Sequence, residues 1–211
     1  MMTRNSQRRF TIKLRLMLTM TAIAALTASC AAPNGHRDAL VDTMADTLVT
    51  VATEDDQRIR FSGKGAGAGI ALSSSMGPAG IAIGVAIDEG IAKDIGRALA
   101  TREFDIAASV KTAFTALPLQ FDLVNIRIVR YGFVTQPSDK DLADAVGPQL
   151  YLDVVADGQA LTIRIPEDPD TANLCTLNLY ELAAIRTNGR LAAQSLNEAA
   201  QCAATLVRAK H

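Results

Sequence analysis

The sequence contains no tryptophan, and aromatic residues make up only 4% of its 211 positions. Aromatic side chains supply much of the contact area at binding sites, so we expect no groove built on them. Histidine is scarce as well, since His36 and His211 are the two in the sequence. His36 lies in a turn-forming spacer and His211 is the last residue, so neither is placed beside a buried carboxylate as a catalytic triad requires. We therefore assign no catalytic residue and expect a protein that is not an enzyme. A hydrolase that uses carboxylates alone stays open as an alternative.

The few cysteines and the many glycines do not form a familiar metal or nucleotide site. Cys175 and Cys202 lie 27 positions apart with no second cysteine or histidine near either, so the spacing of a zinc site is missing. Gly63-Lys64-Gly65 matches a fragment of a phosphate-binding loop, but the full pattern of GxxxxGK followed by Ser or Thr is absent. We expect neither a metal nor a cofactor.

Charge is distributed unevenly along the chain. Residues 1–29 contain five basic residues and no acidic one. Removing these five from the total of 21 leaves 16 basic against 22 acidic residues, so the chain from Cys30 onward carries a net charge near −6. That sign argues against a nucleic-acid partner and against binding to a membrane surface through a basic patch.

The N-terminal 29 residues have the pattern of a signal peptide. A basic start precedes the apolar residues 16–25, which are too few to span a membrane. The stretch ends in Leu26-Thr27-Ala28-Ser29-Cys30, and small residues before a cysteine resemble the lipobox of bacterial lipoproteins. The resemblance implies cleavage before Cys30 and attachment of a diacylglycerol to the Cys30 thiol, with acyl chains such as palmitate. The usual leucine three places before the cysteine is Thr27 here. Ordinary secretion, with cleavage near Ala28, is the alternative.

The lipobox resemblance carries two further expectations. The second mature residue would be Ala31 and not the aspartate that resembles an inner-membrane retention signal, which favours the outer membrane, with the protein facing the periplasm. Acylation of Cys30 would also leave Cys175 and Cys202 as an even pair in an oxidising compartment, so we predict a disulfide between them.

Residues 63–96 contain nine of the fourteen glycines, and the stretch from Gly65 to Ile87 carries no charge. Small residues four positions apart let two helix backbones approach closely, and we expect such helix contacts at Gly80, Gly84 and Gly90. Pro78 lies between two apolar arms and predicts a break there. The segment resembles the glycine-zipper hairpins of some bacterial envelope proteins. Its first arm is rich in glycine and is either a weak helix or extended.

The glycine-rich segment admits two interpretations. It associates with a membrane or with other copies of the chain, or its isoleucines pack internally onto the rest of the protein. Each arm has about a dozen apolar residues where a membrane span needs about 20, so a hairpin of this size would insert only shallowly.

The remaining chain predicts an α+β fold, a small and mainly antiparallel sheet with helices on one face. Before the glycines we expect a helix to about residue 46 and a hairpin over 48–61. After them we expect a helix over 104–117, a strand over 121–134, a short helix over 138–146, strands 149–155 and 159–165 around the Asp157-Gly158 turn, a second hairpin over 174–193 with its turn at Asn188-Gly189, and a helix over 196–209.

Taken together, the sequence predicts four segments: a signal peptide (1–29), a lipid tether and approach (30–62), the glycine-rich segment (63–96) and a C-terminal α+β domain (97–211). We expect a non-catalytic outer-membrane lipoprotein whose periplasmic domain associates through the glycine-rich segment with the membrane or with other copies. The alternative is a binding or pilot module for another envelope or secretion protein, which the domain's general pattern resembles.

Overall fold

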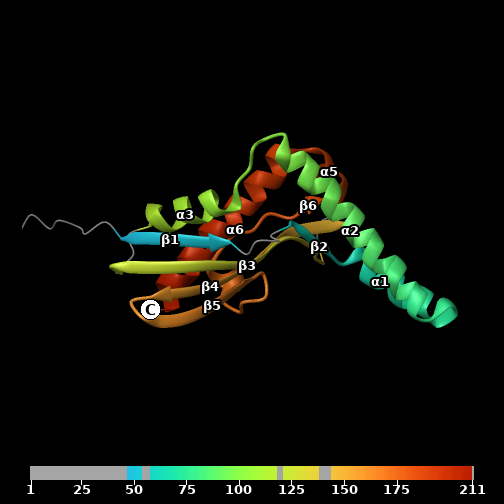
Figure 1. Ribbon diagram of the computed structural model, residues 1–211, viewed down its shortest axis with the longest axis horizontal. Coiled ribbons are helices and arrows are strands. Elements are labelled where there is room, and N and C mark those ends of the chain that lie inside the picture. The colour runs from blue at the N-terminus through green and yellow to red at the C-terminus, as the bar shows by residue number, and fades with distance from the viewer. Residues whose placement is uncertain (1–46, 54–57, 118–120, 138–143, 211) are drawn as a thin grey trace, which may run out of the picture. The chain divides into compact units, whose positions relative to one another are not determined.

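A six-stranded sheet lies at the centre of the fold (Figure 1). The computed structural model describes residues 47–53, 58–117, 121–137 and 144–210, and these belong to one contact unit, Thr43–His211. The sheet order is β1 (Leu48–Thr53), β3 (Leu123–Thr135), β4 (Ala145–Ala156) and β5 (Gln159–Ile165). Two short strands complete it, β2 (Arg60–Ser62) beside β3 and β6 (Tyr180–Glu181) beside β4.

The long strand β3 organises the sheet. β1 pairs in parallel with its first half and β2 in parallel with its second half, while β4 runs antiparallel along nearly its whole length. The register shifts between Ile128 and Arg130, which marks a bulge. Gly132 faces Arg60 so closely that a Cβ on Gly132 would lie 1.8 Å from the Arg60 carbonyl oxygen. The bulge and this glycine lie at the start of the half of β3 that pairs with β2.

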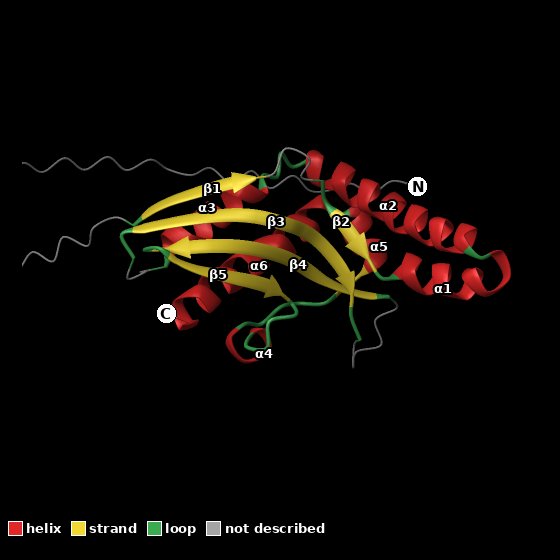
Figure 2. Ribbon diagram, turned by 60° about the horizontal axis from the view of Figure 1, so that its bottom comes forward, coloured by secondary structure: helices red, strands yellow, loops and turns green. Residues whose placement is uncertain are grey.

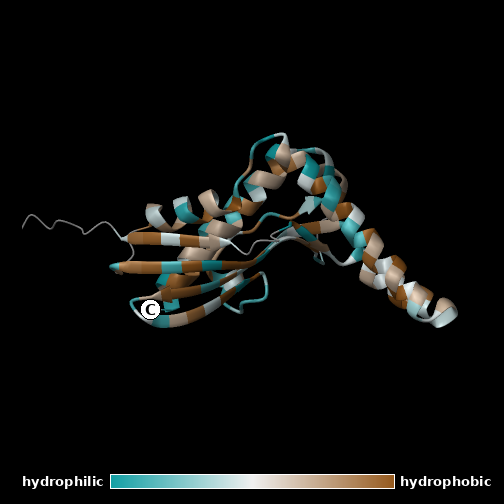
Figure 3. Ribbon diagram, viewed as in Figure 1, coloured by the Kyte–Doolittle hydropathy of each residue, from teal (hydrophilic) through white to brown (hydrophobic). Residues whose placement is uncertain are grey.

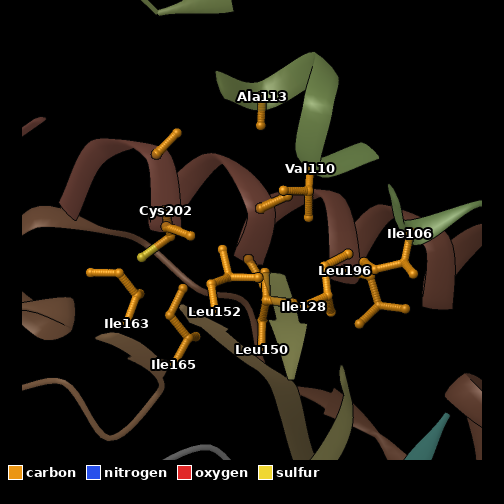
Figure 4. Packing of buried hydrophobic residues seen from close by; sticks show 14 of the residues in the cluster. Ile106, Val110, Ala113, Ile128, Leu150, Leu152, Ile163, Ile165, Leu196 and Cys202 are labelled. Atoms are coloured by element: carbon orange, nitrogen blue, oxygen red, sulfur yellow. The ribbon is translucent and has the colours of Figure 1, made fainter. Parts of the chain in front are cut away.

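Helices cover one face of this sheet (Figure 2). Val124, Ile126 and Ile128 alternate on the buried face of β3, and α3 (Ile106–Ala116) and α6 (Gly189–Lys210) pack there. Figure 4 shows the resulting core, in which side chains from α3 and α6 meet side chains from β3, β4 and β5. The inner face of α6 is rich in alanine, which lets this helix lie close to the sheet. The predicted α+β fold, mainly antiparallel with helices on one face, is confirmed.

The other helices lie in two places. α1 (Lys64–Met76) and α2 (Pro78–Ala100) form a helical hairpin, while α4 (Thr171–Leu174) and α5 (Leu182–Thr187) lie in the connection from β5 to α6. The second half of α2 enters the core through Ile91, Ile95 and Leu99. α2 is therefore one continuous helix that begins in the hairpin and ends in the domain.

Two predicted hairpins are wrong. Strands form near residues 48–53 and 60–62, but both pair in parallel with β3, so they run in the same direction, which a hairpin excludes. The predicted hairpin over 174–193 is replaced by α4, β6, α5 and the start of α6. Its expected turn residue, Asn188, instead accepts a hydrogen bond from the Leu191 amide and so caps α6. The following Gly189 lies against the Ala98 carbonyl oxygen of α2, 2.0 Å from where a Cβ would be.

Three further predictions concern local structure. The short helix expected to reach residue 146 does not, because β4 already begins at Ala145; the earlier part of that prediction, residues 138–143, lies outside the described residues. The helix expected up to residue 46 also lies outside them. The turn at Asp157-Gly158 is confirmed, with positive φ at both residues (45° and 83°), as a tight two-residue connection of antiparallel strands requires.

Candidate functional site

The glycine hairpin, which we define as residues 64–87, is the most unusual part of the described structure. Four of its glycines are buried, Gly65 and Gly69 in α1 and Gly80 and Gly84 in α2, and we call this line of contact the glycine seam. A Cβ on Gly84 would lie 2.2 Å from the Gly65 carbonyl oxygen, and a Cβ on Gly80 would lie 2.5 Å from the Ser73 amide nitrogen. The two helix backbones are therefore in direct contact, which side chains at these positions would prevent.

The large apolar side chains of the hairpin point away from the seam. Ile70, Ile81 and Val85 are 74%, 56% and 55% exposed. Further exposed apolar side chains in the hairpin are those of Met76, Ile83 and Ile87. Ordinary helix pairs bury their large apolar residues against each other and expose small or polar ones. The glycine hairpin has the opposite arrangement, with its smallest residues inside and its largest outside.

No face of α2 within the hairpin is polar. Successive residues of a helix are rotated by about 100°, so Ile81 and Val85 lie on one side of the seam, Ile83 and Ile87 lie on the other, and alanines lie on the face opposite the glycines. Figure 3 shows brown and tan residues along both arms. A helix that is apolar all round is typical of a buried position or of a membrane environment.

Charged groups gather where the hairpin meets the sheet domain. The Asp88 carboxylate accepts hydrogen bonds from the amides of Gly65 (2.7 Å) and Gly63 (3.3 Å). α1 has no capping side chain of its own, so Asp88 supplies its N-terminal cap from the neighbouring helix. The Lys64 ammonium forms an ion pair with Asp144. These contacts close the base of the hairpin at the boundary between its uncharged and charged residues.

The serine hydroxyls at the tip of the hairpin form hydrogen bonds within their own helix. The hydroxyls of Ser73, Ser74 and Ser75 donate to the carbonyls three residues earlier, at 2.7, 2.8 and 3.2 Å. The Gly77 amide donates to the Ser73 carbonyl at 2.9 Å and so ends α1. Because Pro78 has no amide hydrogen, it begins α2 without leaving a donor unpaired. The three serines therefore add no unpaired hydroxyl donor to the tip.

The structure changes the predicted set of glycine contacts. Gly80 and Gly84 lie in the seam, but Gly90 does not, because a Cβ at Gly90 would have no heavy atom within 4 Å. Gly90 therefore makes no contact within the described chain: it lies six residues beyond Gly84, on a side of α2 rotated by about 120° from the seam. Both arms are helical, so the extended form of the first arm is excluded for this structure.

Several functional positions were missed or lie elsewhere. The four-residue spacing identified Gly65 and Gly69 as a small-residue pair, but spacing alone does not tell which pairs face each other. Asp88 was not recognised as a cap, although it is the first charged residue after the uncharged stretch. Cys30, the predicted lipidation site, lies outside the described residues.

The predicted pair of cysteines is joined. A disulfide links Cys175, after α4, to Cys202 in α6, with their Cα atoms 5.4 Å apart. It links the connection after β5 covalently to the helix that covers the sheet.

The Lys210 ammonium, near the end of the same helix, contacts Asp168 at 2.7 Å, and this hydrogen bond raises the pKa of Lys210 above its usual value. The disulfide and this contact are both structural.

A groove beside α3 and a hydrogen-bonded tyrosine on β4 are two further polar features of the described structure. A groove of about 810 Å³ lies between α3 and α6, but its Asp105 carboxylate already caps α3 by accepting from the Ala107 and Ala108 amides. On the strand β4, the Tyr151 hydroxyl accepts from Gln149 at 2.9 Å and donates to Glu167. Burial, together with Glu167, raises the pKa of Tyr151, so this phenol stays protonated near neutral pH.

The described part of the chain, residues 47–53, 58–117, 121–137 and 144–210, shows neither a cluster of metal ligands nor a membrane-spanning helix. Within it, no three His, Cys, Asp or Glu side chains gather in a way that would hold a metal ion. None of the helices described there is both long enough and apolar enough to cross a membrane. Comparisons with protein-family models, with curated proteins and with solved structures find no match to this chain.

Proposed function

We propose that this chain is a non-catalytic outer-membrane lipoprotein, anchored through acylated Cys30, whose periplasmic domain associates with the membrane or with other copies through the glycine hairpin. The observation that carries the proposal is the outward orientation of the hairpin's large apolar side chains, from Ile70 in α1 to Ile87 in α2. Exposed apolar surface of this kind marks an interaction site in soluble proteins.

The glycine seam supports association of the segment over internal packing of its isoleucines onto the rest of the protein. Gly80 and Gly84 already contact α1 of the same chain, so the glycines are used internally. The large side chains are the part left for association. The isoleucines of the hairpin do not pack onto the sheet domain; only the later residues Ile91 and Ile95 do so.

The experiment has two readouts on protein expressed in a bacterial envelope. Mass spectrometry of the mature N-terminus is expected to find an acylated Cys30, and fractionation is expected to place the protein in the outer membrane. Cys30→Ala removes the thiol that would carry the diacylglycerol and is expected to block maturation. An unmodified N-terminus that begins after Ala28 would contradict the anchor.

A second function, a binding module for another envelope protein, is favoured by one feature of the sheet. β5 is the last strand in the sheet order, so within the described chain its outer edge pairs with no strand. Such an edge accepts an added strand from a partner. Photo-crosslinking from Ala160 and Thr162, which are exposed on β5, tests this function. A defined adduct that persists when the hairpin is removed would favour it over association through the hairpin.

A further inference from the structure

We infer that the glycine hairpin inserts into the acyl region of a single bilayer leaflet, with its tip deepest and Lys64 and Asp88 at the headgroups. The inference rests on the proposed function and names lipid acyl chains, not a second copy of the chain, as what covers the hairpin. Its evidence is the distribution of apolar groups, the length of the arms and the position of the first charges.

The distribution of apolar groups favours lipid over a second copy. A protein partner covers one face of a helix pair and leaves the others in water. On α2 the exposed aliphatic side chains lie on both sides of the seam, Ile81 and Val85 on one and Ile83 and Ile87 on the other. α1 adds Ile70, the most exposed of the large apolar residues at 74%. A fluid of acyl chains covers all of these directions at once.

The length of the arms fits one leaflet. From Ile87 to Pro78, α2 rises by about 14 Å at 1.5 Å per residue. The hydrocarbon core of a bilayer is about 30 Å thick, so one leaflet is about 15 Å. The uncharged stretch ends where this length ends, with Lys64 before α1's first glycine and Asp88 after Ile87.

The backbone of the hairpin meets the demands of a nonpolar medium. Every unpaired backbone or hydroxyl donor would be costly there. Asp88 accepts from two amides at the start of α1, the three tip serines donate to carbonyls of their own helix, and the Gly77 and Gly80 amides donate to the Ser73 and Gly77 carbonyls. A turn that reaches only to the middle of a bilayer need not emerge on the far side.

The sheet domain would then be held close to the membrane. α2 continues without interruption from the hairpin into the core, where Ile95 is fully buried. Insertion therefore fixes the direction of α2 relative to the membrane and, with it, one orientation of the sheet. A lipid anchor on Cys30 alone would not fix this orientation.

Tryptophan depth measurements test the inference, because the chain has no tryptophan and one introduced residue is the sole reporter. Full-chain variants Met76→Trp, Ile83→Trp and Ile87→Trp are mixed with vesicles of phosphatidylethanolamine and phosphatidylglycerol that carry bromine either near the headgroup or near the acyl end. Each position is at least 38% exposed, so tryptophan fits without entering the core. Val155→Trp, 39% exposed on the sheet, is the matched control.

We expect emission from all three hairpin variants to shift to the blue on vesicles and to be quenched by brominated lipid. Bromine near the acyl end should quench Met76→Trp most, and bromine near the headgroup should quench Ile87→Trp most. Val155→Trp should be unaffected. The order of the three tryptophan depths depends on the hairpin alone, so we expect it whether or not Cys30 is acylated. If Cys30 is acylated but the tryptophans do not show this order, the lipid anchor stands and the inference about the hairpin is wrong.

Two results would overturn the inference. One is hairpin tryptophans that behave like the control on vesicles. The other is burial of the hairpin tryptophans that occurs without vesicles and grows with protein concentration, which would identify a second copy as the partner.

A charged substitution gives an independent check that does not depend on tryptophan. Ile83→Glu should weaken vesicle binding by about tenfold or more, because a carboxylate enters the acyl region. Val155→Glu should leave it unchanged.

Discussion

At the scale of single residues, the glycines of the hairpin differ sharply although they share one sequence pattern. Gly84 lies against the Gly65 backbone, while Gly90, six residues later in the same helix, has open space where a side chain would extend. In a helix, glycine is less favourable than alanine by about 1 kcal/mol. Gly84 is therefore retained for contact, and Gly90 gains nothing from being glycine within the described structure.

The pair Gly84→Ala and Gly90→Ala should consequently have effects of opposite sign. Gly84→Ala places a methyl group 2.2 Å from the Gly65 carbonyl oxygen, so the arms must separate, at a cost of about 1–3 kcal/mol. Gly90→Ala should stabilise the protein by about 0.5–1 kcal/mol through helix propensity. Hydrogen exchange of the α1 amides measures the first effect locally, and urea unfolding measures the second. Equal effects of the two variants would contradict the assignment of the seam.

At the scale of elements, the sequence predicts those whose signal is local. Val124, Ile126 and Ile128 alternate along the strand predicted over 121–134, and Asp157-Gly158 is a turn by its own conformational preference, so both were found. β1 and β2 were found as strands, but their parallel partner β3 lies beyond three intervening helices, and no local pattern encodes that pairing. Asn188-Gly189 misled because asparagine serves a helix cap as readily as a turn.

The glycine hairpin shows the same difference between features that a local sequence pattern predicts and contacts that it does not. Spacing correctly indicated close backbone contacts at Gly80 and Gly84 and a break at Pro78, since small residues and a proline are local features, but it left the form of the first arm open. It did not indicate that Gly80 and Gly84 would face α1 of the same chain while Gly90 would face nothing. Which of several equally spaced residues meet depends on the turn geometry and on where α1 begins, which Asp88 fixes from the opposite helix.

The disulfide between the α4 connection and α6 should contribute strongly to stability. Closing a separation of 27 residues removes chain entropy worth about 3.5 kcal/mol in the unfolded state. For a protein of this size, each kcal/mol shifts the melting temperature by about 2–4 °C. The double variant Cys175→Ala/Cys202→Ala should therefore melt about 10 °C lower, measured by calorimetry. Reduction of the wild-type protein should lower the melting temperature by a similar amount. An unchanged melting temperature in both experiments would contradict a stabilising role of the disulfide.

The contact between α2 and α5 should depend on pH. The Arg186 guanidinium donates to Asp94 and lowers the pKa of that carboxyl below its usual value of 3.8. A carboxyl with a lowered folded-state pKa contributes stability above pH 3.8 that is lost as pH falls through the lower folded value. Arg186→Gln should thus lower the melting temperature near pH 7 but not in strong acid. Arg97→Gln, at the exposed partner of the same carboxyl, is the control and should have the smaller effect.

At the scale of the whole molecule, the glycine hairpin and the sheet domain are joined at one narrow place. The hairpin's contacts are chiefly between its own arms, and the Gly65 amide lies 2.7 Å from an Asp88 carboxylate oxygen, so the two ends of the hairpin are adjacent. The core uses α2 only from Ile91 onward. The structure therefore separates the packed sheet and helices from the hairpin, and our proposal assigns association to the hairpin.

Removing residues 65–87 and joining Lys64 to Asp88 through a short glycine linker tests that separation. The shortened α2 keeps Ile91, Ile95 and Leu99, so the domain should remain folded, with a cooperative thermal transition and the Cys175–Cys202 disulfide formed. Vesicle binding that depends on the hairpin should be lost. As a control, a variant of the full chain with Gly90→Ala should keep both properties. If the shortened protein instead melts without cooperativity, the hairpin is part of the folding unit and the division between folding and association is wrong.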